Sequence, residues 1–389
     1  MPWKELKPMQ EKLLFVADYL RELESFSGLC LRYGISRKTG YKLVERYSRE
    51  GMEALEERSR RPHSQPSQVP HAIRQAIIEL RRPGCMKLGP KKIQALLQQR
   101  YPDQPVPSRT TIYNVLKGAG HIPPRRLRRR VAASPSGLSS AQVPNGLWSA
   151  DFKGQFLTRD GHWCYPLTVM DHASRYLLGC QALAGTGQDQ AQAAFKALFR
   201  QYGLPERLRT DNGVPFATTG GGGLSRLSIW WIRLGILPER IKPGRPQQNG
   251  RHERMHRTLK DAAATPPAAS ARAQQRRFET FCGEYNSDRP HEALGQKTPA
   301  SLYTASSRAY PERLPELVYP SYIHAHRVSH NGLVYWMGCR IYVGYQLAGE
   351  RISLEAIGDG LWQVCFGPVR LGQFDQRRPK HDDYFTLNV

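Results

Sequence analysis

The stretch Pro246–Lys260, Pro-Gln-Gln-Asn-Gly-Arg-His-Glu-Arg-Met-His-Arg-Thr-Leu-Lys, limits most strongly what this chain can be. It predicts a loop that ends at Asn249, a favoured N-cap residue, and a helix that begins there. Glu253 falls in the first turn, and Arg257 and Lys260 follow on the same helical face. One carboxylate beside a row of cations suits a bound metal with phosphates alongside. A single carboxylate needs partners from elsewhere in the chain.

Two aspartates are the candidate partners. Asp151, in Trp-Ser-Ala-Asp-Phe-Lys-Gly, falls within a predicted strand, and Asp211, in Arg-Thr-Asp-Asn-Gly, falls at a strand end. If the two strands are neighbours, both carboxylates and Glu253 converge at one edge. Carboxylates with open water positions suit Mg²⁺ or Mn²⁺, and two such ions roughly 3.5–4 Å apart support in-line phosphoryl transfer. We therefore predict Asp151, Asp211 and Glu253 as catalytic residues and as ligands of two metal ions.

Charge and cysteine usage narrow the class of partner. The 389 residues include 57 Lys and Arg against 33 Asp and Glu, a formal net charge of +24. Such an excess favours a polyanion, and nucleic acid is preferred to a membrane because no apolar run approaches the ~20 residues of a spanning helix. Seven scattered cysteines form no Cys-x-x-Cys pair, which favours a reduced, cytoplasmic protein. The amino terminus has no signal-peptide core.

The first segment predicts a helix-turn-helix. Apolar residues recur at helical spacing over 9–23, a short helix follows over 26–32, and Ser36 can cap a third helix that runs to Tyr47. A solvated face is the alternative for the leading residues of that helix, but the charge of the chain favours DNA reading. The residues predicted to read DNA are Arg37, Lys38, Thr39 and Lys42.

A second helical segment and a basic tether follow the first. Apolar stripes over 73–80, 88–97 and 112–116 predict a second helix-turn-helix or winged helix. The residues of this segment that are predicted to contact DNA are Arg109, Thr110 and Tyr113. Residues 123–145 are too polar to form a core, and they would follow phosphates or act as a solvated spacer. The predicted DNA contacts there are Arg125, Arg126, Arg128, Arg129 and Arg130.

The middle of the chain predicts a mixed α/β layer. Three hairpin-like strands over 147–157, 163–170 and 176–184 precede a helix over 188–202, a strand over 207–210 and a helix over 224–235. That order is the ribonuclease-H-like arrangement. Residues 261–275, rich in Ala, Pro and Gln, are expected to be loose, and 278–285 to be helical. Gly220–Gly223 is expected to be a flexible insert.

The predicted architecture is therefore multidomain, with all-α helix-turn-helix units, a ribonuclease-H-like α/β catalytic core and a small SH3-like β-barrel at the end. Short β-type runs over 325–376, separated by Asn-Gly, Ala-Gly and Asp-Gly, favour the barrel. The predicted domains are 1–60 and 61–122 (DNA-binding), 123–145 (basic linker), 146–305 (core), 306–324 (linker) and 325–389 (barrel).

Other motifs have rival interpretations. His252-Glu-Arg-Met-His256 matches the H-E-x-x-H helix of zinc proteases, but an Arg lies inside the motif and no third ligand is evident. Asp171 is a further strand-end acid, and a turn-forming role is preferred for it. Gly161-His-Trp-Cys164 is more simply a half-buried hairpin than a metal site.

Several motifs together resemble the DDE-type transposases of bacterial insertion sequences, with the likeness nearest to the IS481 group, related to the IS3 group and to retroviral integrases. They are Gly34–Tyr41, Asp151–Gly154, Thr210–Gly213, Pro246–Lys260, Asn286–Leu294 and Pro299–Leu302. The resemblance implies an integrase core, dependence on Mg²⁺ and binding to terminal inverted repeats. It places Asp151, Asp211 and Glu253 on the family's catalytic acids, and Lys260 where integrases contact the DNA end. The interval from Asp211 to Glu253 is longer than usual, which the Gly220–Gly223 insert would absorb.

The sequence thus predicts a transposase that cleaves transposon ends to expose 3′-hydroxyls and joins them to target DNA. Arg245, Gln248, Arg257 and Lys260 would steer the phosphates. Homo-oligomerisation is expected because two ends must be paired, and the need for an ATPase helper is left open. The alternatives are a DNA-binding regulator with an inactive core, a nuclease that never joins, and the H-E-x-x-H zinc metalloprotease.

Overall fold

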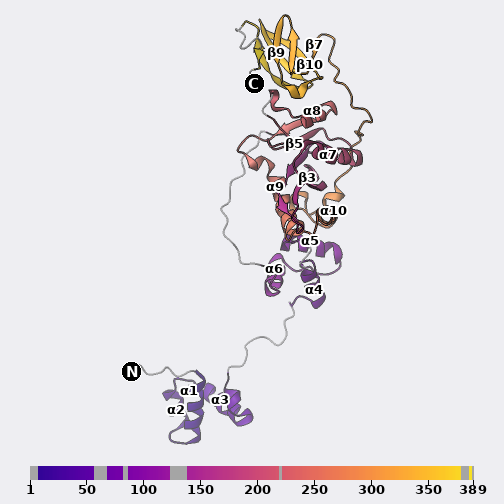
Figure 1. Cartoon of the computed structure of the whole chain (residues 1–389). Helices are drawn as coiled ribbons and strands as arrows, with labels where there is room; N and C mark the ends of the chain where they lie inside the picture. Colours follow the sequence, from indigo (N-terminus) through magenta and orange to yellow (C-terminus); the bar gives the residue numbers. More distant parts are fainter. Residues whose placement is uncertain are drawn as a thin grey trace. The chain divides into compact units, whose positions relative to one another are not determined.

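The computed structural model describes residues 8–56, 68–81, 86–122, 138–218, 221–377 and 385–387 (Figure 1). The chain forms two compact units, residues 1–68 and 69–389. The run of arginines from Arg125 to Arg130 lies outside the described residues.

The first unit is a small three-helix bundle. Its helices are α1 (Pro8–Leu20), α2 (Phe26–Arg32) and α3 (Arg37–Glu50), followed by a 3₁₀ turn, η1 (Met52–Leu55). The hydroxyl of Ser36 accepts a hydrogen bond from the backbone N–H of Thr39, so the predicted N-cap of α3 is confirmed. A Cβ on Gly40 would lie 2.8 Å from the sulfur of Cys30, so the glycine lets α3 approach α2 closely. The predicted helix-turn-helix is present.

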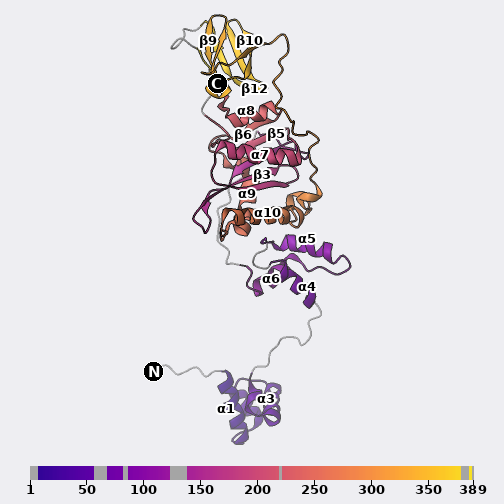
Figure 2. The same ribbon diagram turned by 45° about the vertical axis from the view of Figure 1, so that its right-hand side comes forward.

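A second three-helix group opens the second unit. It consists of α4 (His71–Glu79), α5 (Pro90–Arg100) and α6 (Arg109–Gly118) (Figure 2). These helices share a buried core that includes Ile77, Ile93 and Ile112. Ser108 caps α6 by accepting from the backbone N–H of Thr111. No strand is described between residues 86 and 122, so the helix-turn-helix form of the prediction is the one observed there.

The central sheet has the predicted order of elements. Its strands are β1 (Trp148–Phe152), β2 (Phe156–Leu157), β3 (Trp163–Asp171), β4 (Leu177–Leu183), β5 (Arg207–Thr210) and β6 (Leu237–Arg240). β3 pairs antiparallel with β1, β2 and β4, whereas β5 lies parallel to both β1 and β6. The central order is β4–β3–β1–β5–β6, and the ribonuclease-H-like prediction for the core is confirmed.

Helices cover both faces of this sheet. On one face, α7 (Gln188–Tyr202) and α8 (Arg226–Arg233) form a core with β1 and β5 that includes Trp148, Phe195 and Trp231. On the other face lie α9 (Gly250–Leu259), its π-helical extension η4 (Lys260–Ala264) and α10 (Ala271–Ser287). A 3₁₀ turn, η3 (Pro246–Asn249), leads into α9. Because successive residues of β1 face opposite sides, only alternate residues of this strand face α9.

The segment expected to be loose is ordered, and that expectation is wrong. Gln274, which is fully buried, accepts a hydrogen bond from the backbone N–H of Ala268 and donates to the carbonyl of Ala263. These bonds tie the Ala- and Pro-rich stretch to α10, which begins at Ala271 and is longer than predicted. The buried amide of Gln274 therefore replaces two of the hydrogen bonds that the broken backbone lacks.

The C-terminal strands form two sheets around one core. β12 (Val369–Asp375), β11 (Leu361–Phe366), β10 (Arg351–Gly358) and β7 (His324–Arg327) form the first sheet, and β13 (Phe385–Thr386), β9 (Cys339–Tyr342) and β8 (Leu333–Trp336) the second. No hydrogen-bonded pairing between the two sheets is seen among the described strands, so the predicted closed barrel is not confirmed. Leu224, Ile229 and Ile232, at and within α8, belong to the same apolar cluster as these sheets.

The glycine insert contacts the C-terminal strands. Gly221–Gly223 forms a short 3₁₀ turn, η2, and a Cβ on Gly222 would lie 3.0 Å from a methyl of Leu371 in β12. The left-handed φ of 62° at Gly222 suits glycine. The insert is thus held against β12 rather than being a free loop, in contrast to the expectation.

Candidate functional site

The register between β1 and β5 brings the two candidate aspartates to one place. Ser149 pairs with Arg209 in parallel strands, and Asp151 and Asp211 each come two residues later. Residues two apart on a strand share a face, so Asp151 lies on the face of Ser149. The hydroxyl of Ser149 lies 2.9 Å from Nδ1 of His252 in α9, so this is the face that α9 covers. Asp211, the first residue after β5, lies near enough for its charge to raise the pKa of Asp151.

Helix α9 is attached to this face by two buried histidines. Nε2 of His252 and Nε2 of His256 lie 2.6 and 2.7 Å from the hydroxyl of Thr168, which itself donates to the carbonyl of Asp151 over 3.0 Å. One hydroxyl has one proton and two lone pairs, so both histidines must donate from Nε2. Ser149 then donates to Nδ1 of His252. Burial lowers the pKa of both histidines, that of His256 to about 3, so both are neutral.

This arrangement contradicts the zinc-protease interpretation of the same motif. Zinc binds a ring nitrogen that has a free lone pair. His252 uses both of its ring nitrogens in hydrogen bonds, and its neighbour His256 donates from Nε2. In the described structure both histidines therefore attach α9 to the sheet.

Asn249 has a role that differs from the prediction. It precedes α9 as expected, but its side chain makes no capping hydrogen bond. Its amide instead lies 3.3 Å from Oδ2 of Asp151 and donates to it. Asn249 is buried, so the contact is shielded from water. The residue at the start of α9 therefore positions a candidate catalytic carboxylate.

The electrostatics of Asp151 show that the three acids act on one another. Burial raises the pKa of Asp151 most, and the charges of Asp211 and Glu253 raise it as well, so that the net value is about 7. A hydrogen bond from the backbone of Phe152 and the charge of Lys153 oppose this effect. A buried carboxylate with a raised pKa and two acidic neighbours is a site that favours a cation.

The side chains of Asp151, Asp211 and Glu253 nevertheless do not form a group that is placed to hold a metal ion. Asp211 forms the turn after β5 and accepts a hydrogen bond from the N–H of Gly213 over 3.1 Å. Glu253 is exposed and makes no hydrogen bond or ion pair with another described side chain. Since the three charges interact, the structure brings these residues into one neighbourhood, but it does not assemble a metal-ligand cluster from the described side chains.

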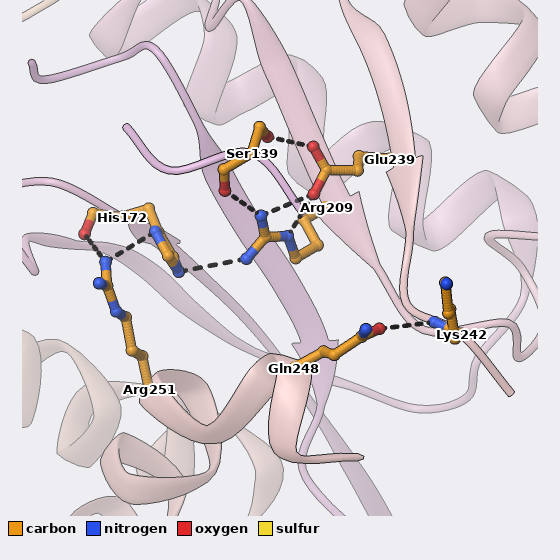
Figure 3. Close-up of polar contacts among 7 residues, drawn as sticks. All are labelled: Ser139, His172, Arg209, Glu239, Lys242, Gln248 and Arg251. Atoms are coloured by element: carbon orange, nitrogen blue, oxygen red, sulfur yellow. Dashed lines mark hydrogen bonds and ion pairs between the residues drawn. The ribbon is translucent and has the colours of Figure 1, made fainter. Parts of the chain in front are cut away.

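Polar contacts fix the approach to α9 (Figure 3). Gln248 accepts a hydrogen bond from the backbone N–H of Lys242 over 2.7 Å. Arg251 donates to Nδ1 of His172 over 2.8 Å and to its carbonyl over 3.1 Å. Burial and the charges of Arg251, Arg209 and Arg175 lower the pKa of His172 to about 3, so the imidazole stays neutral and can accept.

The same network holds β5 to β6. Arg209, on the α9 face of β5, lies 2.6 Å from the carboxylate of Glu239 in β6, and Figure 3 shows it between Glu239 and His172. It also donates to the carbonyl of Ser139, whose hydroxyl donates to Glu239. The strand that ends at Asp211 is thereby anchored at its neighbour.

Asp171 has the turn-forming role that was preferred for it. One of its oxygens accepts from the backbone N–H of Asn145 over 2.8 Å, and the other accepts from the N–H and hydroxyl of Ser174 over 2.8 and 2.6 Å. Its carboxylate is fully buried and is used by this turn.

The other predicted DNA contacts are mostly at the surface. Arg37, Lys38, Thr39 and Lys42 are exposed on α3, and Arg109, Thr110 and Tyr113 are exposed on α6. Arg245, Arg257 and Lys260 are exposed near α9. Gln248 is the exception, because its side chain is used by the contact with Lys242.

Residues that sequence reasoning missed surround the acids. Ser149, Thr168, His172 and Arg209 were not singled out, although Ser149 shares the two-residue period with Asp151. That two-residue period could have predicted that Ser149 lies on the same face of the strand as Asp151. The partners Thr168 and Arg209 follow only from the strand order, which is a long-range property.

Comparisons with known proteins identify the class. Models described as "Integrase core domain" match residues 141–246 and 234–299, and a "Homeodomain-like domain" model matches residues 39–116, a range that runs from α3 to α6. Residues 141–299 are therefore similar to integrase core domains. The predicted resemblance to the DDE-type transposases and integrases is confirmed.

Relatives of this chain include retroviral polyproteins. The chain is 25% identical over 175 residues to the Gag-Pol polyprotein of baboon endogenous virus (strain M7), covering 45% of the chain and 10% of the polyprotein. It is 25% identical over 205 residues to the Gag-Pol polyprotein of avian reticuloendotheliosis virus, covering 50% and 16%. The chain therefore spans only a small part of these relatives.

Solved structures with some similarity include two viral integrases. A simian T-cell lymphotropic virus intasome in complex with PP2A regulatory subunit B56 gamma matches at a TM-score of 0.38 and 18% identity, covering 71% of this chain and 93% of that one. The catalytic core domain of HTLV-2 integrase in complex with magnesium matches at a TM-score of 0.33 and 13% identity, covering 42% of this chain and 98% of that one.

In the described part of this chain, no helix is both long and apolar enough to cross a membrane.

Proposed function

We propose that the chain is a DNA transposase that cleaves the ends of a mobile element and joins the resulting 3′-hydroxyls to target DNA. The observation that carries this proposal is the pairing of Ser149 with Arg209 in β1 and β5: Asp151 and Asp211 each follow two residues later, and the charges of Asp211 and Glu253 both act on Asp151. The integrase core match over residues 141–299 supports the same class of reaction.

The donors fit a hard divalent cation. Asp151, Asp211 and Glu253 present oxygen ligands, which Mg²⁺ and Mn²⁺ prefer. Burial, followed by the charges of Asp211 and Glu253, raises the pKa of Asp151, and a bound cation would favour the ionised form of this carboxylate. When bound, a pair of such ions activates a water or 3′-hydroxyl and stabilises the leaving oxygen. A magnesium ion is named in the HTLV-2 integrase core structure.

The protein's own groups prepare the site. Asn249 holds Oδ2 of Asp151, and Thr168 holds its backbone carbonyl. Glu253 is exposed on α9, so its carboxylate can turn toward the aspartates when a cation is present. Arg257 and Lys260, on the same helical face, would steer DNA phosphates toward it.

We assign DNA recognition to the three-helix bundle of α1 to α3 and to the three-helix group of α4 to α6. The exposed starts of α3 and α6 would read base edges in the element's terminal inverted repeats, and pairing of two ends would require more than one copy of the chain. A simian intasome is one of the similar structures. No feature of the described residues calls for an ATPase helper.

A strand-transfer assay tests the proposal. The full chain is incubated with Mg²⁺, a labelled oligonucleotide duplex of the element's end and a target plasmid. Wild type is expected to yield joined product, and Asp151→Asn, Asp211→Asn and Glu253→Gln are each expected to lose at least about 10²-fold in rate. Asp189→Asn, an exposed acid in the first turn of α7 on the opposite face of the sheet, is the matched control and should retain activity.

Each rival function has its own result in this assay. Binding to the repeat end without cleavage at any divalent metal would favour the regulator with an inactive core. Cleavage without joining would favour the nuclease. Equal activity in the control and in the three acid variants would refute the proposed site.

A further inference from the structure

A basic cavity of about 250 Å³ lies beside α9, on the side of the helix occupied by Arg251 and Arg254. Its charged lining residues are Lys92, Arg175, Arg251, Arg254, Arg289 and Glu292. Since a water molecule takes about 30 Å³ of liquid volume, the cavity has room for a small hydrated anion. The cavity is distinct from the Asp151 and Asp211 neighbourhood, because neither aspartate lines it.

Among the residues that the structure describes, none of the five cations that line this cavity forms an ion pair. Glu292, its only lining carboxylate, lies 2.5 Å from the ammonium of Lys91 at the surface. No other acid of the described residues lies within ion-pair distance of Arg175, Arg254 or Arg289. Two buried nitrogens, Nη1 of Arg175 and Nε2 of His291, have no hydrogen-bond partner. An unsatisfied buried donor such as Nη1 of Arg175 is rare in folded proteins and points to a missing partner, whereas Nε2 of His291 is a donor in only one tautomer of the neutral ring.

The electrostatics agree with this geometry. Burial and the charges of Arg289 and Arg254 lower the pKa of Lys92 to about 7. Burial and the charge of Arg251 lower the pKa of Arg175 to about 10. Like charges that depress one another's pKa in a partly buried space destabilise the empty cavity, and a bound anion would relieve them.

The backbone directs Arg175 into this position. Arg175 has a φ of 64°, in the left-handed region that non-glycine residues seldom adopt. The turn before it is held by the hydrogen bonds from Ser174 to Asp171. A strained residue is kept only where the surrounding structure imposes it, and such residues cluster at functional sites.

We propose that this cavity binds one phosphate group of the DNA backbone, held by Arg175, Arg254 and Arg289 of the core and Lys92 of α5. Guanidinium groups match phosphate oxygens with paired hydrogen bonds. The DNA source of the phosphate rests on the proposed function. It is favoured over a free ion because a second cavity of about 460 Å³ shares Arg254, Thr258 and Arg289 with the first and also contains Glu253 and Arg257. A strand seated in the first cavity can thus continue toward a candidate catalytic acid.

Salt-dependent DNA binding tests the inference without requiring catalysis. Binding of the full chain to a fluorescent duplex of arbitrary sequence is measured with a chelator present, over a range of salt concentrations. Arg289→Gln and Lys92→Gln are each expected to reduce the slope of log K against log salt by about 0.9, the value of one lost phosphate contact. Arg272→Gln, an exposed position on α10 with the same change of charge, should leave the slope near that of wild type. Circular dichroism confirms that each variant is folded.

The outcomes separate the sources of phosphate and the two proposals. An equal slope change in Arg272→Gln would overturn the site, because net charge alone would explain it. Unchanged slopes, with inorganic phosphate raising the melting temperature of wild type but not of Arg289→Gln, would assign a free-phosphate site and overturn the DNA assignment. A reduced slope in a chain that performs no strand transfer would support the cavity while the proposed catalytic function failed.

Discussion

The side-chain amide of Asn249 donates a hydrogen bond to Oδ2 of Asp151 over 3.3 Å, across the contact between the start of α9 and strand β1. We predict that Asn249→Ala slows strand transfer roughly 10-fold or more, because a hydrogen bond to a charged group contributes about 1.5–3 kcal/mol. The Mg²⁺ concentration at half-maximal rate should rise, while the Kd for end DNA stays unchanged. Single-turnover kinetics with a Mg²⁺ titration measures both quantities.

The Asn249→Asp variant sharpens this test. It keeps the shape of the side chain but replaces the donor with a further negative charge beside Asp151, so its rate should fall below that of Asn249→Ala. A purely structural role would lower the melting temperature of both variants without moving the Mg²⁺ midpoint, and that result would contradict the positioning role.

The raised pKa of Asp151 makes stability depend on pH in the absence of metal. Its pKa is about 7 in the folded chain against an ordinary value of 3.8, so the folded state binds this proton more tightly than the unfolded state. The contribution is fully present below about pH 4 and is lost as pH rises through 7. Asp151→Asn should gain, relative to wild type, on the order of 2–4 kcal/mol between pH 4 and pH 8. Urea unfolding with a chelator at several pH values measures this difference. A constant difference across that range would show that Asp151 is not perturbed.

The buried histidines of α9 should be needed for stability and not for zinc. His252→Ala removes hydrogen-bond partners of Ser149 and Thr168 and leaves a cavity, so the free energy of unfolding should fall by about 2–4 kcal/mol. Metal analysis of the purified wild-type chain should find no stoichiometric zinc. If zinc were present and were lost in His256→Ala, the structural assignment of these histidines would be wrong.

The pair of Arg209 and Glu239 should behave as a buried ion pair. Their side chains are 3% and 12% exposed, so Arg209→Met leaves an uncompensated carboxylate and should cost about 3–5 kcal/mol in unfolding free energy. The double variant with Glu239→Met should recover most of that loss. Chemical denaturation of the two single variants and the double variant completes the cycle. If the double variant were as unstable as the single variants, lost packing and not an unpaired charge would explain the loss of stability.

The leading residues of α3 should set sequence preference. Lys38→Ala is expected to weaken binding to the repeat end by about 1–3 kcal/mol if Lys38 contacts a base, and to relax specificity at one position. Lys12, on α1, whose ammonium is bonded to the carbonyl of Leu55, supplies a control of equal charge in the same unit. Competition binding against substituted duplexes distinguishes a base contact from a phosphate contact, which would weaken all sequences alike.

Local patterns predicted much of the fold. Helix α7 and strand β5 have the predicted bounds, because apolar periodicity and Gly203 mark them within a few residues. Ser36 and Ser108 were recognisable as caps by type and position. The strand pairing that joins Asp151 to Asp211 could be stated only as a condition, since it depends on which strands are neighbours.

The failures have a common physical origin. Asn249 was taken as a cap because of its type, yet a buried carboxylate from a distant strand is a stronger partner for its amide. The stretch over 261–275 was expected to be loose because no local pattern predicts the contacts that hold it, which include those of Gln274 and the hydrogen bond from Arg277 to the carbonyl of Pro266. The roles of Ser149, Thr168 and Arg209 likewise arise from contacts across the sheet.

The shared apolar cluster of α8 and the C-terminal sheets has an implication for building chimaeras of this chain. Ile229 and Ile232 project from α8 into the same interior as Val334 and Phe366. The C-terminal sheets therefore cannot be replaced by cutting the chain at the linker before β7 alone. A graft from a relative would have to bring the outward surface of α8 with it, or redesign that surface to match the incoming strands.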